Sequence, residues 1–264
     1  MSDLLRSIVL GVIQGLTEFL PVSSSGHLEL AKYILGDTST GEQSLFFTIM
    51  VHVATALSTV YIFRKDIGEI LKGIFSKPWN ESKAFTLNVI ISMVPAALVG
   101  FFAEPLIESL FDRKIGLVGA MLLVTALLLF LADRSKKSHR SVGPFEALLI
   151  GVAQAVAILP GISRSGATIA TSVMLGIDRY SAARFSFLMV VPLILGKISY
   201  DLIGGELTLI PGEMINVAAG FVAAFITGAV ACKLMISIVQ KSQLKYFAIY
   251  CAIVGIFAII LVTI

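Results

Sequence analysis

Long runs of apolar residues recur along the chain, and their length sets the fold class. A membrane-crossing helix needs about 18 or more consecutive, mainly apolar residues, whereas the helices of a soluble domain usually keep a polar face. We therefore predict an all-α polytopic membrane protein. Six runs reach this length, at residues 46–63, 86–103, 115–132, 184–203, 215–232 and 246–264.

Two further apolar segments, 4–34 and 146–177, are interrupted in the middle. Each has the pattern of a helix, a tip rich in proline, serine and glycine, and a second helix. Non-helical backbone at membrane depth is tolerated only where it is buried in protein or lines a wet cavity. The pattern predicts two re-entrant hairpins, each entering and leaving the membrane on one side.

The two interrupted segments are copies of each other. GVIQGLTEFLPVSSSG begins at Gly11 and GVAQAVAILPGISRSG begins at Gly151, and they align without a gap. Later matches, such as Gly100 with Gly228, indicate that the repeat continues. We predict one integral membrane domain, 1–264, built as an inverted-topology repeat of 1–132 and 146–264. Each half has one re-entrant hairpin and three crossing helices, and the odd number of crossings inverts the second copy.

Composition fits a membrane protein and argues against nucleic-acid binding. Of the 264 residues, 57% are hydrophobic and 14% are charged, and the mean hydropathy is +0.94. The formal net charge of +3 is small, and the basic residues fall in loops instead of along one face. We expect bilayer lipid as a partner and no nucleic acid.

The charges of the loops predict an orientation. The basic segments 64–85, 133–145 and 233–245 alternate with the acidic segments 103–114 and 201–213. Because positively charged loops stay in the cytoplasm, both termini are expected outside. The first hairpin then enters from outside and the second from the cytoplasm, so that their tips meet near the midplane.

The first hairpin carries an ionisable group in an apolar stretch. Gln14 and Glu18 lie four residues apart and so share one helix face. A charged side chain inside a membrane is costly and marks a functional site by default. The alternative is a shallow hairpin whose Glu18 faces water.

The tip that follows reads Pro21-Val22-Ser23-Ser24-Ser25-Gly26-His27. Serines are good N-cap residues, and the exposed backbone amides of a helix start bind anions, phosphate in particular. Three hydroxyls, these amides and an imidazole suit a phosphate ester or anhydride. Ordinary capping with a structural histidine is the alternative.

The second tip, Pro160-Gly161-Ile162-Ser163-Arg164-Ser165-Gly166, places an arginine among serines and glycines at a helix start. A guanidinium forms bidentate, charge-assisted hydrogen bonds with phosphate oxygens. We expect Arg164 to bind phosphate. A structural ion pair with Glu18 of the opposite hairpin is the alternative.

With QGLTEFLPVSSSGH and LPGISRSG both in view, the chain resembles the undecaprenyl-diphosphate phosphatase family, integral membrane enzymes associated with bacitracin resistance. The resemblance covers essentially the whole chain. One departure is Gln14, where many members have glutamate, so that Glu18 is the one carboxylate of the pair. Gln14 can bind a metal or position water but cannot act as a base.

The resemblance implies hydrolysis of undecaprenyl diphosphate, a polyprenyl diphosphate lipid, on the outer face of the bacterial cytoplasmic membrane. The product, undecaprenyl phosphate, is the lipid carrier reused in cell-wall synthesis. It also implies a divalent cation, with Mg²⁺ expected and Ca²⁺ as the alternative.

Within that reaction, the residues of the two tips receive expected roles. We favour Ser24 as nucleophile, activated by His27 or Glu18. Direct attack by His27, and a water activated by Glu18, stay open. Gln14 and Glu18 are expected to hold the cation, and Arg164 is expected to neutralise phosphate charge. The remaining residues of both tips are expected to bind phosphate oxygens: Ser23, Ser25, Gly26, Ser163, Ser165 and Gly166.

Other readings stay open at this stage. Inverted repeats with midplane hairpins also build transporters, so a carrier or flippase for a lipid phosphate or organic anion is the alternative function. His52 is expected to be a hydrogen-bonded core histidine, with a supporting role at the first hairpin as its alternative. The oligomeric state is open, and a homodimer is one alternative.

Overall fold

The computed structural model describes residues 2–36, 41–103, 114–136, 138–204, 214–241 and 243–263. Within these ranges the regular secondary structure is helical, apart from one isolated bridge between Arg140 and Ile177. Most of the acidic segments 103–114 and 201–213, on which the predicted orientation partly depends, lies outside the described residues.

Both predicted hairpins form, and polar caps start their second helices. Ser23 accepts a hydrogen bond from the Gly26 backbone amide at 3.2 Å, and Ser163 accepts the equivalent bond from Gly166 at 3.0 Å. Such caps satisfy amides that the first helical turn leaves unpaired. The first hairpin is α1 (Asp3–Phe19) and α2 (Ser24–Ile34), and the second is α8 (Pro144–Val156) and α9 (Arg164–Met174).

The six predicted crossing segments are helices as well. Five of the described helices are long and apolar enough to cross a membrane, namely α3, α5, α7, α11 and α12, and α10 covers the sixth predicted range. Their bounds are α3 (Gly41–Ile62), α5 (Glu81–Phe102), α7 (Ile115–Asp133), α10 (Arg179–Gly204), α11 (Met214–Gln240) and α12 (Leu244–Thr263).

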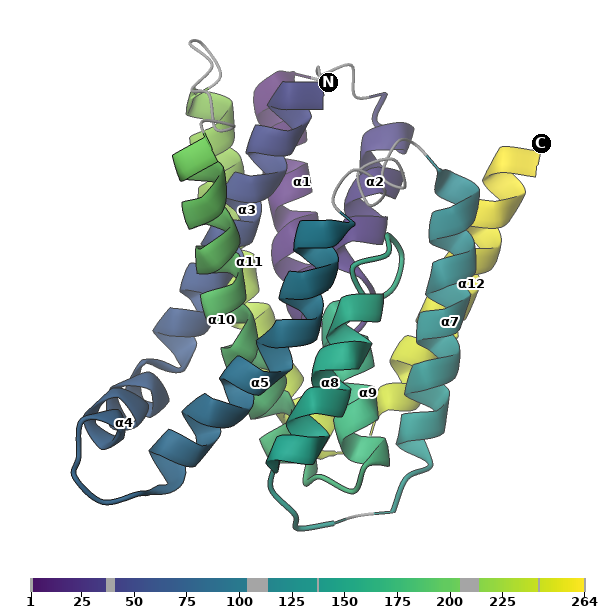
Figure 1. Cartoon of the computed structure of the whole chain (residues 1–264). Coiled ribbons are helices and arrows are strands. Elements are labelled where there is room, and N and C mark those ends of the chain that lie inside the picture. The colour runs from purple at the N-terminus through teal and green to yellow at the C-terminus, as the bar shows by residue number, and fades with distance from the viewer. Residues whose placement is uncertain are drawn as a thin grey trace.

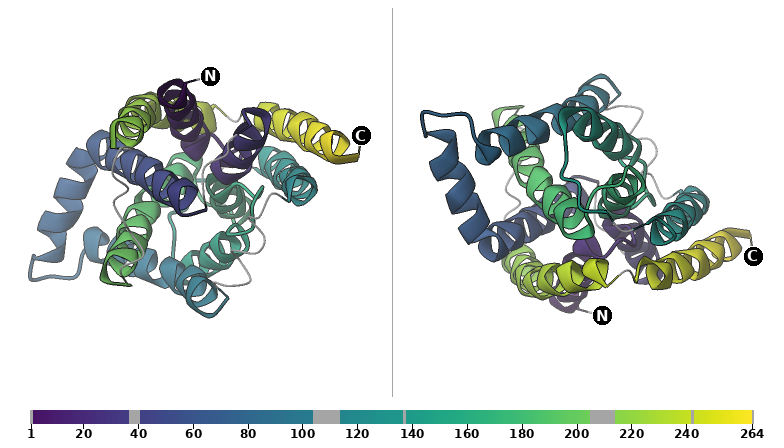
Figure 2. Two further views of the ribbon diagram at one scale, coloured as in Figure 1. Left: turned by 90° about the horizontal axis from the view of Figure 1, so that it is seen from above. Right: turned by 90° about the horizontal axis from the view of Figure 1, so that it is seen from below.

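Among the described helices, α4 (Arg64–Ile74), in the polar stretch 64–85, was not predicted from the sequence. It has a strongly amphipathic pattern but no buried residue. Figure 1 shows it projecting from the bundle beside α3 and α5, and Figure 2 places it on the side opposite α7 and α12. The segment that follows exposes the aromatic side chains of Phe75 and Trp79, and exposed aromatic rings of this kind are typical of the membrane–water interface.

The two hairpins enter the bundle from opposite ends. In Figure 1 α1 and α2 descend from the end that holds both termini, α8 and α9 rise from the other end, and both tips lie in the middle. The first helix of each hairpin packs closely on a helix of the other half. A Cβ on Gly11 would collide with the backbone of Gly220 in α11, and one on Gly151 would lie 2.5 Å from the carbonyl oxygen of Ser92 in α5.

These contacts are equivalent under the sequence repeat, because Gly11 aligns with Gly151 and Ser92 with Gly220. The tips repeat the pattern. A Cβ on Gly26 would lie 3.1 Å from the Gly161 Cα, and one on Gly166 would lie 3.4 Å from the Pro21 Cβ. The small residues of the motifs therefore let the two tips touch backbone to backbone.

Candidate active site

Glu18 is the centre of a polar cluster where the two tips meet. Its side chain is 4% exposed, so its charge needs partners within the protein. Oε2 accepts hydrogen bonds from Gln14 Nε2 at 2.9 Å and from Ser24 Oγ at 2.7 Å. Oε1 forms an ion pair with Arg164 Nη2. Groups from both hairpins thus meet on one buried carboxylate.

Arg164 lies in the first turn of α9 and reaches the last turn of α1 across the tip contact. The sequence indicated two alternative partners for this guanidinium, a phosphate and Glu18. In the structure it forms an ion pair with Glu18. That pair engages Nη2, whereas a guanidinium carries five N–H donors. The Arg164 side chain is 23% exposed, so the group can hold Glu18 and still present donors to a ligand.

Ser24 and His27 lie in the first turn of α2 but face different partners. The Ser24 hydroxyl donates to Glu18. His27 Nδ1 lies 2.8 Å from the Ser23 carbonyl oxygen, and Nε2 lies 2.9 Å from the hydroxyl of Tyr250 in α12, on which the ring stacks. Of the two bases considered for Ser24, Glu18 is therefore the one in hydrogen-bond contact.

The other predicted serines of the tips lie in pairs, one pair within each tip. The hydroxyl oxygens of Ser23 and Ser25 lie 3.4 Å apart, and those of Ser163 and Ser165 lie 3.3 Å apart. Ser23 has φ of +71°, the one positive value at a described residue other than glycine. A serine held in this region costs free energy, and such strain concentrates at functional sites.

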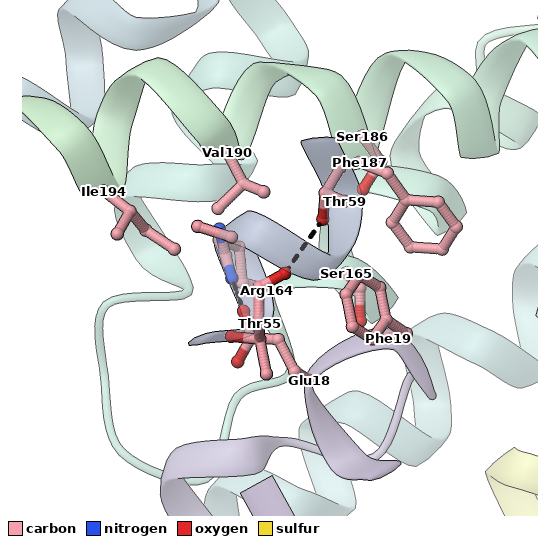
Figure 3. A pocket seen from close by; sticks show the side chains of 11 residues that line it. Glu18, Phe19, Thr55, Thr59, Arg164, Ser165, Ser186, Phe187, Val190 and Ile194 are labelled. Atoms are coloured by element: carbon pink, nitrogen blue, oxygen red, sulfur yellow. Dashed lines mark hydrogen bonds and ion pairs between the residues drawn. The ribbon is translucent and has the colours of Figure 1, made fainter. Parts of the chain in front are cut away.

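A small pocket opens beside the Glu18–Arg164 pair, as Figure 3 shows. The crossing helices α3 and α10 line it with the hydroxyl-bearing residues Thr55, Thr59 and Ser186, and the same two helices also contribute apolar side chains. The full lining is Glu18, Phe19, Thr55, Ala56, Thr59, Arg164, Ser165, Ser186, Phe187, Val190 and Ile194.

The pocket residues of α3 were not predicted from the sequence, although their spacing carried a signal. Thr48, His52, Thr55 and Thr59 recur at helical spacing within an apolar run, which places them on one face. His52 Nε2 lies 3.8 Å from Glu18 Oε2. Its supporting role at the first hairpin, held open as an alternative, therefore agrees with its position.

Gln14 and its repeat mate Gln154 are both buried. Gln14 donates through Nε2 to Glu18, and its Oε1 has no hydrogen-bond partner among the described residues. Neither amide atom of Gln154 has a hydrogen-bond partner among those residues. An unpartnered amide oxygen beside a carboxylate is the donor set that hard divalent cations prefer.

Comparison with known proteins finds similar proteins over nearly the whole chain. The family model described as bacitracin resistance protein BacA matches residues 7–257. The chain is 60% identical to an undecaprenyl-diphosphatase of Christiangramia forsetii, over 98% of each chain. It is 46% identical to one of Bacteroides fragilis, over 97% of each chain. A third relative of that name, from Methanococcus vannielii, is 37% identical over 97% of this chain and 99% of its own.

These matches span nearly all of the chain, both hairpins included, and so cover every residue of the polar cluster. A full-length match at this identity also favours an enzyme over the carrier that the architecture alone left open. The chain belongs to the bacitracin resistance protein BacA family.

Proposed function

We propose that this integral membrane protein hydrolyses undecaprenyl diphosphate to undecaprenyl phosphate and inorganic phosphate. One observation carries the proposal: a buried carboxylate from one hairpin tip binds the guanidinium of the other tip, with a serine hydroxyl on the same carboxylate. The relatives named undecaprenyl-diphosphatase support it.

Ser24 is the nucleophile in this proposal. Glu18 takes the proton from Oγ, at 2.7 Å, as Oγ attacks the terminal phosphorus and the bond from that phosphorus to the bridging oxygen breaks. Undecaprenyl phosphate leaves and takes this proton from Glu18, and a phosphoserine forms. Water then attacks the phosphoserine, Glu18 accepts its proton and passes it to Ser24 Oγ, and inorganic phosphate leaves.

Arg164 and the two helix starts bind the phosphate groups. Phosphoryl transfer depends mainly on positioning and on charge neutralisation. The guanidinium supplies positive charge, and the first amides of α2 and α9 point into the tips with the positive ends of their helix dipoles. Ser23, Ser25, Ser163 and Ser165 add hydroxyl donors.

The residues present fit a divalent cation, which we propose to be Mg²⁺ with Ca²⁺ as the alternative. Gln14 Oε1, buried and unpartnered in the described chain, and the Glu18 carboxylate would hold it. When bound, the cation neutralises part of the charge of the diphosphate.

The same proposal includes the setting of the reaction. The protein lies in the bacterial cytoplasmic membrane as two inverted repeats, with its site open to the outer side, where it recycles the lipid carrier for cell-wall synthesis and so confers bacitracin resistance. The basic segments 64–85, 133–145 and 233–245 support this orientation.

The test is phosphate release by the purified full chain from undecaprenyl diphosphate, with and without a chelator. Glu18→Ala and Arg164→Ala are each expected to lower the rate at least about 100-fold. Full rates in both variants would remove the proposed site. An intact chain that binds the lipid but releases no phosphate would instead support a carrier.

A further inference from the structure

We infer that His52 is a third ligand of the cation site that the proposed function assigns to Gln14 and Glu18. A site with one imidazole nitrogen would favour Mn²⁺ over Ca²⁺, which binds oxygen ligands almost exclusively. The inference rests on the proposed function for the presence of a cation, and on the geometry around His52 for its third ligand.

The hydrogen bond at Nδ1 sets the tautomer of His52. Nδ1 lies 2.8 Å from the carbonyl oxygen of Thr48, one turn earlier in α3. A carbonyl oxygen only accepts, so the proton is assigned to Nδ1. In the neutral ring, Nε2 then carries a lone pair, which is the form of imidazole that binds metals.

That lone pair faces the site. Nε2 lies 3.8 Å from Glu18 Oε2, too far for a hydrogen bond. Oε2 already accepts hydrogen bonds from Gln14 and Ser24. Two ligands that each lie about 2.0–2.5 Å from one cation are roughly 3–4 Å apart. The separation of Nε2 from Oε2 therefore suits a shared cation better than a direct contact.

Gln14 supplies the amide oxygen among the three proposed cation ligands. Its Nε2 donates to Glu18, which fixes the orientation of the amide, because the reverse orientation would place Oε1 against a carboxylate oxygen. Oε1 is then left buried without a partner among the described residues. The carboxylate, the amide oxygen and the imidazole come from two helices, α1 and α3. The imidazole and the amide oxygen each offer a lone pair, whereas Glu18 Oε2 accepts two hydrogen bonds, one of which a bound cation would replace.

A bracing contact holds α3 in this position. Lys32 of α2 donates through Nζ to Ser44 Oγ at 2.8 Å and to Thr48 Oγ1 at 3.1 Å. These bonds tie α2 to the turn of α3 whose carbonyl orients His52. A bound metal ligand is commonly oriented in this way by a hydrogen bond to its second ring nitrogen.

The probe is Mn²⁺, added to the purified full chain in detergent, and the readout is electron spin echo modulation from ¹⁴N bonded directly to the metal. The chain has three histidines, so each can be replaced alone. His52→Gln keeps a polar side chain with an oxygen that can bind a metal. His27→Gln removes the histidine of the first hairpin tip. His139→Gln is the control, because His139 lies in a loop.

Nitrogen modulation is expected in the intact chain, in His27→Gln and in His139→Gln, and is expected to disappear in His52→Gln. His52→Gln should also weaken Mn²⁺ binding by about tenfold and change Ca²⁺ binding little. Glu18→Gln should abolish binding of both cations at this site.

Mn²⁺ binding that requires Glu18 but shows no nitrogen modulation would overturn the inference, as would modulation lost in His27→Gln or no Mn²⁺ binding at all. Phosphate release is measured on the same preparation. Release without nitrogen modulation overturns the role of His52 alone, whereas absence of release overturns the proposed function.

Discussion

Breaking the ion pair between Glu18 and Arg164 should lower the free energy of unfolding by several kcal/mol. Glu18→Leu removes the buried carboxylate and leaves the guanidinium without its partner. Breaking a buried ion pair in this way costs about 3–5 kcal/mol. Because the Arg164 side chain is 23% exposed and water can reach part of it, we expect the lower end, about 3 kcal/mol.

The double variant Glu18→Leu/Arg164→Met should recover most of that loss. Replacing both charges with apolar side chains of similar volume is often neutral or stabilising. We therefore expect the double variant within about 1 kcal/mol of the intact chain, and a coupling energy of about 2 kcal/mol or more in the cycle.

The assay is reversible unfolding of the full chain in mixed detergent micelles, followed by far-ultraviolet circular dichroism. If the two single changes add to within about 0.5 kcal/mol, the two charges do not interact and the ion pair does not stabilise the fold. The double variant should be folded and inactive, because it lacks the Arg164 guanidinium that binds phosphate. A folded double variant that releases phosphate would separate the ion pair from catalysis.

Further predictions concern packing and the histidine of the first tip. Gly151→Ala should destabilise the chain by about 1–3 kcal/mol, because its Cβ would press on Ser92 of α5. In the control variant Gly100→Ala the new Cβ meets nothing within 4 Å, so that change should be neutral or slightly stabilising. Equal melting temperatures for the two variants would contradict this packing. Tyr250→Phe removes the hydroxyl that lies 2.9 Å from His27 Nε2. Because Glu18 and not His27 activates Ser24 in the proposed mechanism, kcat should stay within about twofold of that of the intact chain. A fall in kcat of about tenfold or more would show that His27 serves the reaction.

The helices were predictable because their signals are local. The apolar runs have the length of a membrane crossing, and proline, glycine and serine mark both hairpin tips. The meeting of the tips also followed from the sequence, since the motifs that begin at Gly11 and Gly151 are repeat copies. α4 was missed because it is a short amphipathic helix among charged residues, with none of its side chains buried.

Side-chain partners were harder to predict, because they depend on rotamers and on distant segments. The partner of His27 Nε2 is Tyr250, which lies on the last helix. Thr55 and Thr59 can bond to the backbone of their own helix, so a threonine in an apolar run does not by itself indicate a site. The periodic placement of His52 with these threonines was the usable signal.

In the proposed function, the two tips form one phosphate site to which Arg164 contributes the charge. Chemical rescue tests it most directly: phosphate release from undecaprenyl diphosphate is measured for Arg164→Ala in the presence and absence of guanidinium ion. We predict a loss of about 10²–10⁴-fold that guanidinium partly restores in Arg164→Ala but not in Glu18→Ala. Hydrolysis by Arg164→Ala at the rate of the intact chain, without guanidinium, would contradict the account.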